Sequence, residues 1–149
     1  MMYEDNQIKT QIVLNAKYPI PSLLNAVGHL MQGLAAQVSA ELELLEYPSL
    51  ERAFVSSISK SPLILLKAKN SSQLHALALA AIASEITANV FVGAMFGSSS
   101  DQQREATAAL SATDHDFVAV AVIGATAVVG PLTKKFSLFK INSKEEDHE

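Results

Sequence analysis

Three polar side chains, Asn25, His29 and Gln32, could together form the wall of a binding or catalytic site. Their spacing of four and three residues puts them on one face of a helix, near its start. An imidazole can act as a general base, and a neighbouring amide can polarise a carbonyl group. A solvated helix face carries similar polar stripes, so the residues alone leave both interpretations open.

Two other segments carry groups that could do chemistry. Thr113-Asp114-His115-Asp116 sets an imidazole between carboxylates that could orient it as a base, or it forms a charged turn in which Asp114 bonds its own backbone. Ser98-Ser99-Ser100-Asp101 could be a mobile cover over a cleft, or a plain flexible loop in which Asp101 caps a short helix.

The sequence lacks the motifs that mark several classes of catalytic and binding site. The glycines do not have the spacing of a phosphate-binding loop, and there is neither a nucleophile elbow nor a His-x-x-x-His pair. The chain has no cysteine, which removes disulfides, thiolate metal sites and cysteine nucleophiles. We therefore expect no metal and no cofactor.

The charge and the apolar runs bear on partners and location. The net charge is -4 and the lysines are scattered along the sequence, so we expect no nucleic-acid partner. The start, Met-Met-Tyr-Glu-Asp-Asn, does not resemble a signal peptide, and the apolar run Leu74–Ala83 is too short to span a bilayer. We expect a cytoplasmic protein without a membrane segment.

Hydrophobic periodicity predicts an α/β fold in which a small mixed β-sheet is flanked by helices. The predicted strands cover residues 8–16, 41–46, 53–58, 62–69, 90–96, 116–124 and 136–141. The predicted helices run from Pro21-Ser22 to about Ser39, from a cap at Asn70–Ser72 to a stop at Asn89, from Asp101 to Leu110, and as a turn over 126–135. We expect one domain, 1–149, with an ordered core over about 7–141 and a solvated acidic tail over 142–149.

Three stretches resemble a known family. Phe117–Gly124 followed by Gly130–Phe139 is similar to the C-terminal signature of the domain-of-unknown-function family 2000. Leu24–Leu30, followed by Gly33-Leu34, resembles the first helix of that family, and Lys60–Ala68 resembles its central strand. Together they cover most of the chain from about residue 8 to 140.

This resemblance implies a fold similar to that of the type II peptidyl-tRNA hydrolases, which are often homodimers. Asn25 stands where those hydrolases have a lysine, His29 where they have a glutamine, and Gln32 where they have a histidine. Their Asp-x-Gly-x-Thr motif is unmatched in Gly93–Gly97. We therefore expect a shared scaffold with a changed site, and no peptidyl-tRNA hydrolase activity.

Three functions remain open. The chain could bind a small ligand in a cleft beside Asn25, His29 and Gln32, with Ser98 and Ser99 in a loop that covers it. It could be a hydrolase of an ester or amide, with His29 as the base and Asn25 polarising the carbonyl. It could also be a structural or interaction protein whose main property is a homodimer.

Overall fold

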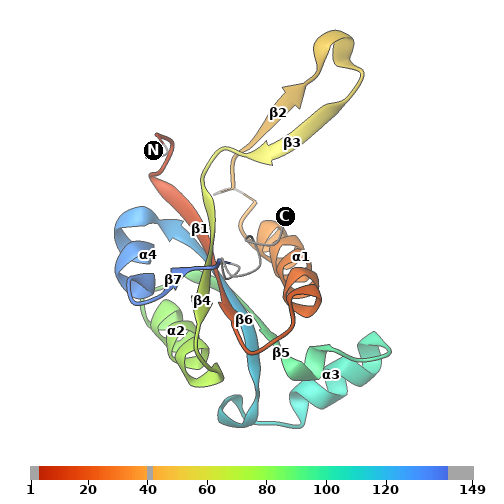
Figure 1. The fold of residues 1–149 in the computed structure, drawn as a ribbon, viewed down its shortest axis with the longest axis vertical. Helices are drawn as coiled ribbons and strands as arrows, with labels where there is room; N and C mark the ends of the chain where they lie inside the picture. Colours follow the sequence, from red (N-terminus) through yellow and green to blue (C-terminus); the bar gives the residue numbers. More distant parts are fainter. Residues whose placement is uncertain (1–3, 40–41, 141–149) are drawn as a thin grey trace, which may run out of the picture.

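The computed structural model describes residues 4–39 and 42–140 and contains a five-stranded mixed sheet in the order β5-β6-β1-β4-β7 (Figure 1). β1 is parallel to β4, and the other neighbouring pairs are antiparallel. This mixed sheet confirms the predicted α/β class. The strands of this sheet are β1 (Ile8–Asn15), β4 (Leu63–Ala68), β5 (Thr87–Val92), β6 (Phe117–Ala125) and β7 (Ser137–Leu138).

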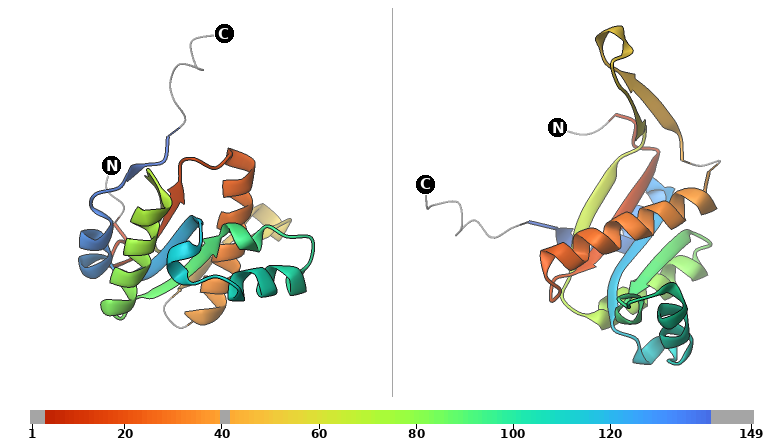
Figure 2. Two further views of the ribbon diagram at one scale, coloured as in Figure 1. Left: turned by 90° about the horizontal axis from the view of Figure 1, so that it is seen from below. Right: turned by 90° about the vertical axis from the view of Figure 1, so that its right-hand side faces the viewer.

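β6 explains why helices lie on both faces of the sheet. Every residue from Phe117 to Ile123 is buried, so alternate side chains need cover on opposite faces. α1 (Ile20–Gln37) covers one face, while α2 (Ser71–Ala83) and α4 (Thr126–Thr133) cover the other (Figures 1 and 2). The predicted strand 116–124 is confirmed, with bounds that differ by one residue at each end.

α1 packs its apolar stripe on β1 and β6. Leu23, Leu30 and Leu34 are buried there, as the helical period predicts. Leu24 is 63% exposed, because it lies one position beyond the buried face of the helix. The helix begins at Ile20, after Pro19, and Ser22 does not cap it.

The chain between α2 and β5 corrects one prediction. Asn70 caps α2 as expected, with its side chain accepting a hydrogen bond from the Gln73 N–H at 3.0 Å. The helix already ends at Ala83, and Glu85 turns the chain with a left-handed φ of 57°. Asn89 is therefore not a helix stop but a residue within β5, and the predicted strand 90–96 starts three residues too late and ends four residues too late.

The remaining elements lie outside the two packed layers. α3 (Ser100–Ala108) buries none of its side chains, and it is capped by Ser99 rather than by Asp101 as predicted, because the Ser99 hydroxyl accepts from the Gln102 N–H. Of the predicted final strand 136–141, only β7 forms, and Ile141 and the tail 142–149 lie outside the described residues. No helix in the described ranges is long and apolar enough to cross a membrane.

The expected hairpin forms and projects away from the rest of the molecule (Figures 1 and 2). It consists of β2 (Leu44–Pro48) and β3 (Val55–Ser59), paired antiparallel as a separate two-stranded sheet. At its tip, Glu51 and Arg52 both have left-handed φ angles, 59° and 57°. Residues other than glycine adopt such angles only when their surroundings impose them.

Ser71 joins α2 to the start of β6, and its removal should cost stability. Its hydroxyl accepts a hydrogen bond from the Phe117 N–H at 2.7 Å, and Phe117 is buried. We predict that Ser71→Ala lowers the free energy of unfolding by about 1–3 kcal/mol, because this buried donor loses its partner. Urea unfolding measures the loss.

Ser72→Ala is the matched control for this substitution. Ser72 is the next residue of α2 and is exposed. Its replacement should change stability by no more than about 0.5 kcal/mol. Equal effects of the two substitutions would show that the Ser71 hydrogen bond contributes nothing.

Candidate ligand-binding cleft

A cleft of about 500 Å³ lies between α1, β5, the turn that follows β5, and α3. The turn is a short 3-10 helix, Gly93–Met95. Figure 1 shows these elements side by side at one edge of the sheet. The cleft is lined by Asn25, His29, Leu30, Asn89, Val90, Phe91, Met95, Phe96, Gly97 and Gln103.

Asn25 and His29 come to the cleft from α1, one helical turn apart. Both are exposed, and neither makes a hydrogen bond to the rest of the described chain, so both keep their polar atoms for other partners. The His29 ring lies beside Phe91, with 6.2 Å between ring centroids. These two residues of the predicted stripe therefore face a hollow in the surface.

The other predicted residues do not line this cleft. Gln32 is exposed on α1 beyond its edge. Ser99 is occupied as the cap of α3, and the Ser98 hydroxyl bonds the Gln102 side chain. The segment expected to cover the cleft is thus the start of a capped helix.

Aromatic rings form the apolar wall. Phe91 is buried and Phe96 is 40% exposed, and their centroids lie 4.9 Å apart at an angle of 57°. Tyr18 also lies beside Phe96, with ring centroids 6.1 Å apart. The exposed face of Phe96 offers a ligand a flat apolar contact.

Asn89 fastens β5 to α1, a role that sequence reasoning missed. Its side-chain N–H donates to the Leu30 carbonyl at 3.1 Å, while its side-chain oxygen accepts from the Val90 N–H at 3.1 Å. The amide lies against Gly33, where a Cβ would come within 2.8 Å of Nδ2. In the sequence, the signal for this close approach of Asn89 to α1 is Gly33, a glycine in the interior of a predicted helix.

Gln103 fixes the opposite wall. Its side-chain N–H donates to the Gly97 carbonyl at 2.9 Å. A Cβ on Gly97 would come within 2.8 Å of the Gln103 Cγ, so this glycine also permits a close contact. The turn after β5 is thereby held against α3, which sets the width of the cleft.

His115 is not an acid-flanked base. Its Nε2 lies 2.9 Å from the Thr107 carbonyl, and Nδ1 is buried without a partner among the described residues. Asp114 accepts from the Ser111 hydroxyl at 2.9 Å, and Asp116 accepts from the Tyr18 hydroxyl. Neither carboxylate orients the imidazole, so this segment is a charged turn. Asp114 bonds the Ser111 side chain, however, rather than its own backbone as the second interpretation expects.

The Tyr18 hydroxyl donates a hydrogen bond to the Asp116 carboxylate. Burial raises the pKa of Tyr18 to about 12, and the hydrogen bond to Asp116 and the negative charge of its carboxylate add to this rise. Tyr18 therefore stays neutral at physiological pH and holds its ring against Phe96.

The cleft itself is electrically neutral. None of its lining residues is a lysine, arginine, aspartate or glutamate. Among the described residues, no group of three or more histidine and carboxylate side chains is arranged to hold a metal ion. The lining instead offers amides, an imidazole and aromatic surface.

Comparison with known proteins now identifies the family. The family described as protein of unknown function, DUF2000, matches residues 8–140. The chain belongs to this family. The chain is also similar to a solved structure of a protein of unknown function from Agrobacterium tumefaciens strain C58, with 18% sequence identity and a TM-score of 0.79 over 90% of this chain and 98% of that one. The comparison of this DUF2000 protein with curated proteins gives no match.

Gly33→Ala tests the contact between α1 and β5. The new methyl group would displace the Asn89 amide, and the loss of its hydrogen bonds should lower the free energy of unfolding by about 1–3 kcal/mol. Gly28→Ala is the control, since nothing lies within 4 Å of a Cβ at this position of the same helix. It should stabilise the protein by up to about 1 kcal/mol. Equal changes in thermal unfolding would contradict this assignment.

A spectroscopic titration of tyrosine tests the Tyr18–Asp116 pair. Tyr18 should ionise at a pKa of about 12 rather than 10.0, and Asp116→Asn should lower this value without restoring 10.0, because burial is the larger cause. Since the folded pKa is the higher one, the stability from this pair is present below pH 10.0 and lost as pH rises through about 12. Tyr18→Phe identifies the step by removing it, and an unchanged step in Asp116→Asn would contradict the pairing.

Proposed function

We propose that this DUF2000 protein binds a small, uncharged ligand in the cleft beside α1. The observation that carries the proposal is the pairing of free polar groups with a neutral apolar wall: Asn25 and His29 face the same hollow as Phe96. The volume of about 500 Å³ falls within the range of small-molecule sites. Pockets of this kind hold a ligand by apolar contact and orient it by a few polar groups.

The neutral lining argues for the class of ligand. An anion or cation entering this cleft would lose water without meeting an opposite charge, which is costly. A flat molecule with an amide or similar polar edge matches better, because Phe96 can contact its ring while Asn25, His29 and Gln103 bond its edge.

Hydrolysis of an ester or amide is the weaker candidate. His29 would serve as the base, and Asn25 would polarise the carbonyl. The ring has no carboxylate partner to orient it, and the lining holds no lysine or aspartate. The likeness to type II peptidyl-tRNA hydrolases, the absence of a nucleic-acid partner, the homodimer and the cytoplasmic location stay predictions.

Benzamide and benzoate form a matched pair of probes for this cleft. They share ring and shape but differ in charge, so benzamide should bind at least about 10-fold more tightly, because the carboxylate would be buried without a cation. Two-dimensional NMR of the amide groups measures both affinities and locates the site through the resonances of Asn25, Gly97 and Gln103.

Three variants localise this binding. His29→Ala and Asn25→Ala should each weaken benzamide binding, whereas Gln32→Ala should change it much less, since Gln32 lies beyond the cleft. Shifts that map elsewhere, or equal affinities for benzoate and benzamide, would contradict the proposal.

A further inference from the structure

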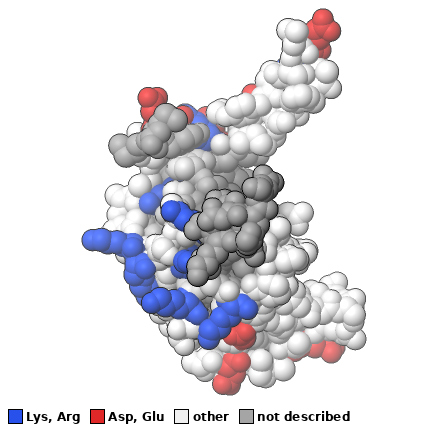
Figure 3. All heavy atoms as spheres, viewed as in Figure 1, with Lys and Arg blue, Asp and Glu red and all other residues white. Residues whose placement is uncertain are grey.

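Lysines that are scattered along the sequence gather on one side of the folded molecule. No aspartate or glutamate occurs in residues 61–84 or 117–140, which build β4, α2, β6, α4 and β7. In Figure 3 the basic side chains line up along the edge where Figure 1 places α4, α2 and β7, whereas most acidic side chains in this view lie above or below that edge. The two stretches without acidic residues hold Lys67, Lys69, Lys134, Lys135 and Lys140.

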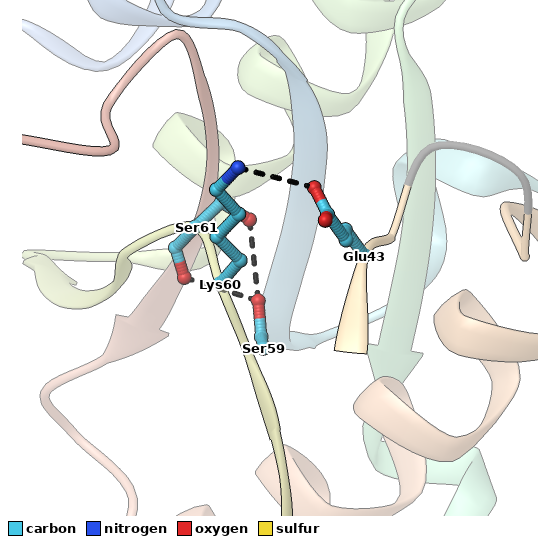
Figure 4. A network of polar contacts seen from close by, with 4 residues as sticks. All are labelled: Glu43, Ser59, Lys60 and Ser61. Atoms are coloured by element: carbon cyan, nitrogen blue, oxygen red, sulfur yellow. Dashed lines mark hydrogen bonds and ion pairs between the residues drawn. The ribbon is translucent and has the colours of Figure 1, made fainter. Parts of the chain in front are cut away.

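These lysines have no carboxylate partner among the described residues. The ion pairs within residues 4–39 and 42–140 are those of Arg52 with Glu46 and of Lys60 with Glu43. Figure 4 shows the second pair, 3.5 Å apart at the base of the hairpin. One side of a chain with a net charge of -4 is therefore basic and free to attract an anionic partner.

On this side, α2 is apolar on its outer face as well as on the face that packs against the sheet. It contains no lysine, arginine, aspartate or glutamate, and it buries Leu74 and Leu77. Its outer face exposes Leu79 and Ile82, at 55% and 69%. A surface helix ordinarily turns charged and polar residues outward, whereas a helix that is apolar all round is covered on every side. The outer face of α2 therefore marks an interaction surface.

α4 and β7 extend this apolar surface. α4 contacts α2 and has no charged residue, and its Val128 is 42% exposed. Val128 lines the same small hollow as Ser84, which directly follows α2. Leu138 of β7 is 52% exposed and pairs with Leu66, which lies in the core beneath α2, so Leu138 faces the same side of the sheet.

The lysines lie at the border of the apolar side chains. Lys134 and Lys135 follow α4, Lys69 precedes α2, and all three are exposed. β7 brings these positions together, because it starts two residues after Lys135 and pairs with β4 just ahead of Lys69. Glu85 lies beyond the opposite end of α2. We define the α2–α4 surface as Lys69, Leu79, Ile82, Val128, Lys134, Lys135, Leu138 and Lys140.

We propose that the α2–α4 surface binds the face of a lipid bilayer that contains anionic phospholipids. Protein segments that lie on a bilayer combine apolar side chains, which enter the boundary between headgroups and acyl chains, with lysines that attract anionic headgroups. This inference is independent of the cleft. The cleft lies beside α1, which covers the other face of the sheet, so it stays open to solvent when the protein is on the bilayer.

The combination of side chains favours a bilayer over a nucleic acid. Phosphate contacts dominate binding to nucleic acids, so such a partner would use the lysines and leave Leu79 and Ile82 without a role. A bilayer uses both kinds of side chain, and it needs no complementary groove. α2 and α4 form the outer layer on this side of the sheet, which suits a broad, flat partner (Figure 2).

Sedimentation of the full chain with lipid vesicles tests this proposal. Vesicles of equal amounts of phosphatidylcholine and phosphatidylserine should bind the protein at least about 10-fold more tightly than vesicles of phosphatidylcholine alone, because each lysine near an anionic surface contributes roughly 5-fold. Added salt should weaken the binding, since it screens these charges.

One pair of variants tests the lysines. Lys134→Gln/Lys135→Gln should weaken binding to the mixed vesicles at least about 10-fold. Arg52→Gln/Arg104→Gln is the control, because it gives the same net charge but changes exposed residues of the hairpin and α3. It should change the affinity much less.

A second pair of variants tests the apolar side chains. Leu79→Ser/Ile82→Ser should also weaken binding to the mixed vesicles, because less apolar surface enters the bilayer. The control is Leu50→Ser/Phe54→Ser at the tip of the hairpin, where the exposed fractions are 90% and 63%. Thermal unfolding checks that each variant is folded.

Several outcomes would overturn the proposal. They are no binding to the mixed vesicles, equal binding to both kinds of vesicle, and an affinity in either α2–α4 variant that is no weaker than in its control. Binding to an RNA duplex without binding to vesicles would assign the lysines to a nucleic acid instead.

Discussion

The burial of β6 on both faces is the constraint on which the rest of this structure depends. Seven consecutive residues, Phe117–Ile123, are shielded from water, so the sheet cannot leave either face open. α1 must cover one face, and α2 and α4 must cover the other. The side chains on this strand are mostly Val and Ala, which allow helices to approach closely, and the chain has no tryptophan to fill wider gaps. The elements left over, α3 and the hairpin, have no place in this core.

The same arrangement decides where a ligand site can lie. In open α/β sheets, crevices commonly form where two neighbouring parallel strands send the chain to opposite faces, which here is the end of β1 and β4. At that position, hydrogen bonds within the chain already join α2, β1 and β6. The buried Asn15 side chain donates to the Phe117 carbonyl at 2.9 Å, and Ser71 accepts from the Phe117 N–H. The cleft instead forms at the edge strand β5, where Asn89 fastens α1 and the turn after the strand bends away.

The sequence predicts an element correctly where its apolar residues are periodic. The prediction is wrong where a contact with a distant residue determines the structure. The period of α1 predicts Leu23, Leu30 and Leu34 in the core, and the apolar run of β6 predicts its central place. Asn89 has the local character of a helix stop, but its amide bonds Leu30, which is 59 residues away. Asn25 and His29 were predicted from spacing alone, whereas Phe96 and Gln103 join them only through the fold, and no local signal could have paired them. The sequence shows that the hairpin segment is rich in apolar residues, but it does not show that the hairpin lies apart from the core.

A crystallographic fragment screen tests the central claim most directly. Crystals soaked with neutral aromatic amides should show bound density between His29 and Phe96, with polar contacts to Asn25 or Gln103. Density for these fragments at other surfaces only, with the cleft empty in crystals where no neighbouring molecule blocks it, would contradict the claim that this hollow is a ligand site.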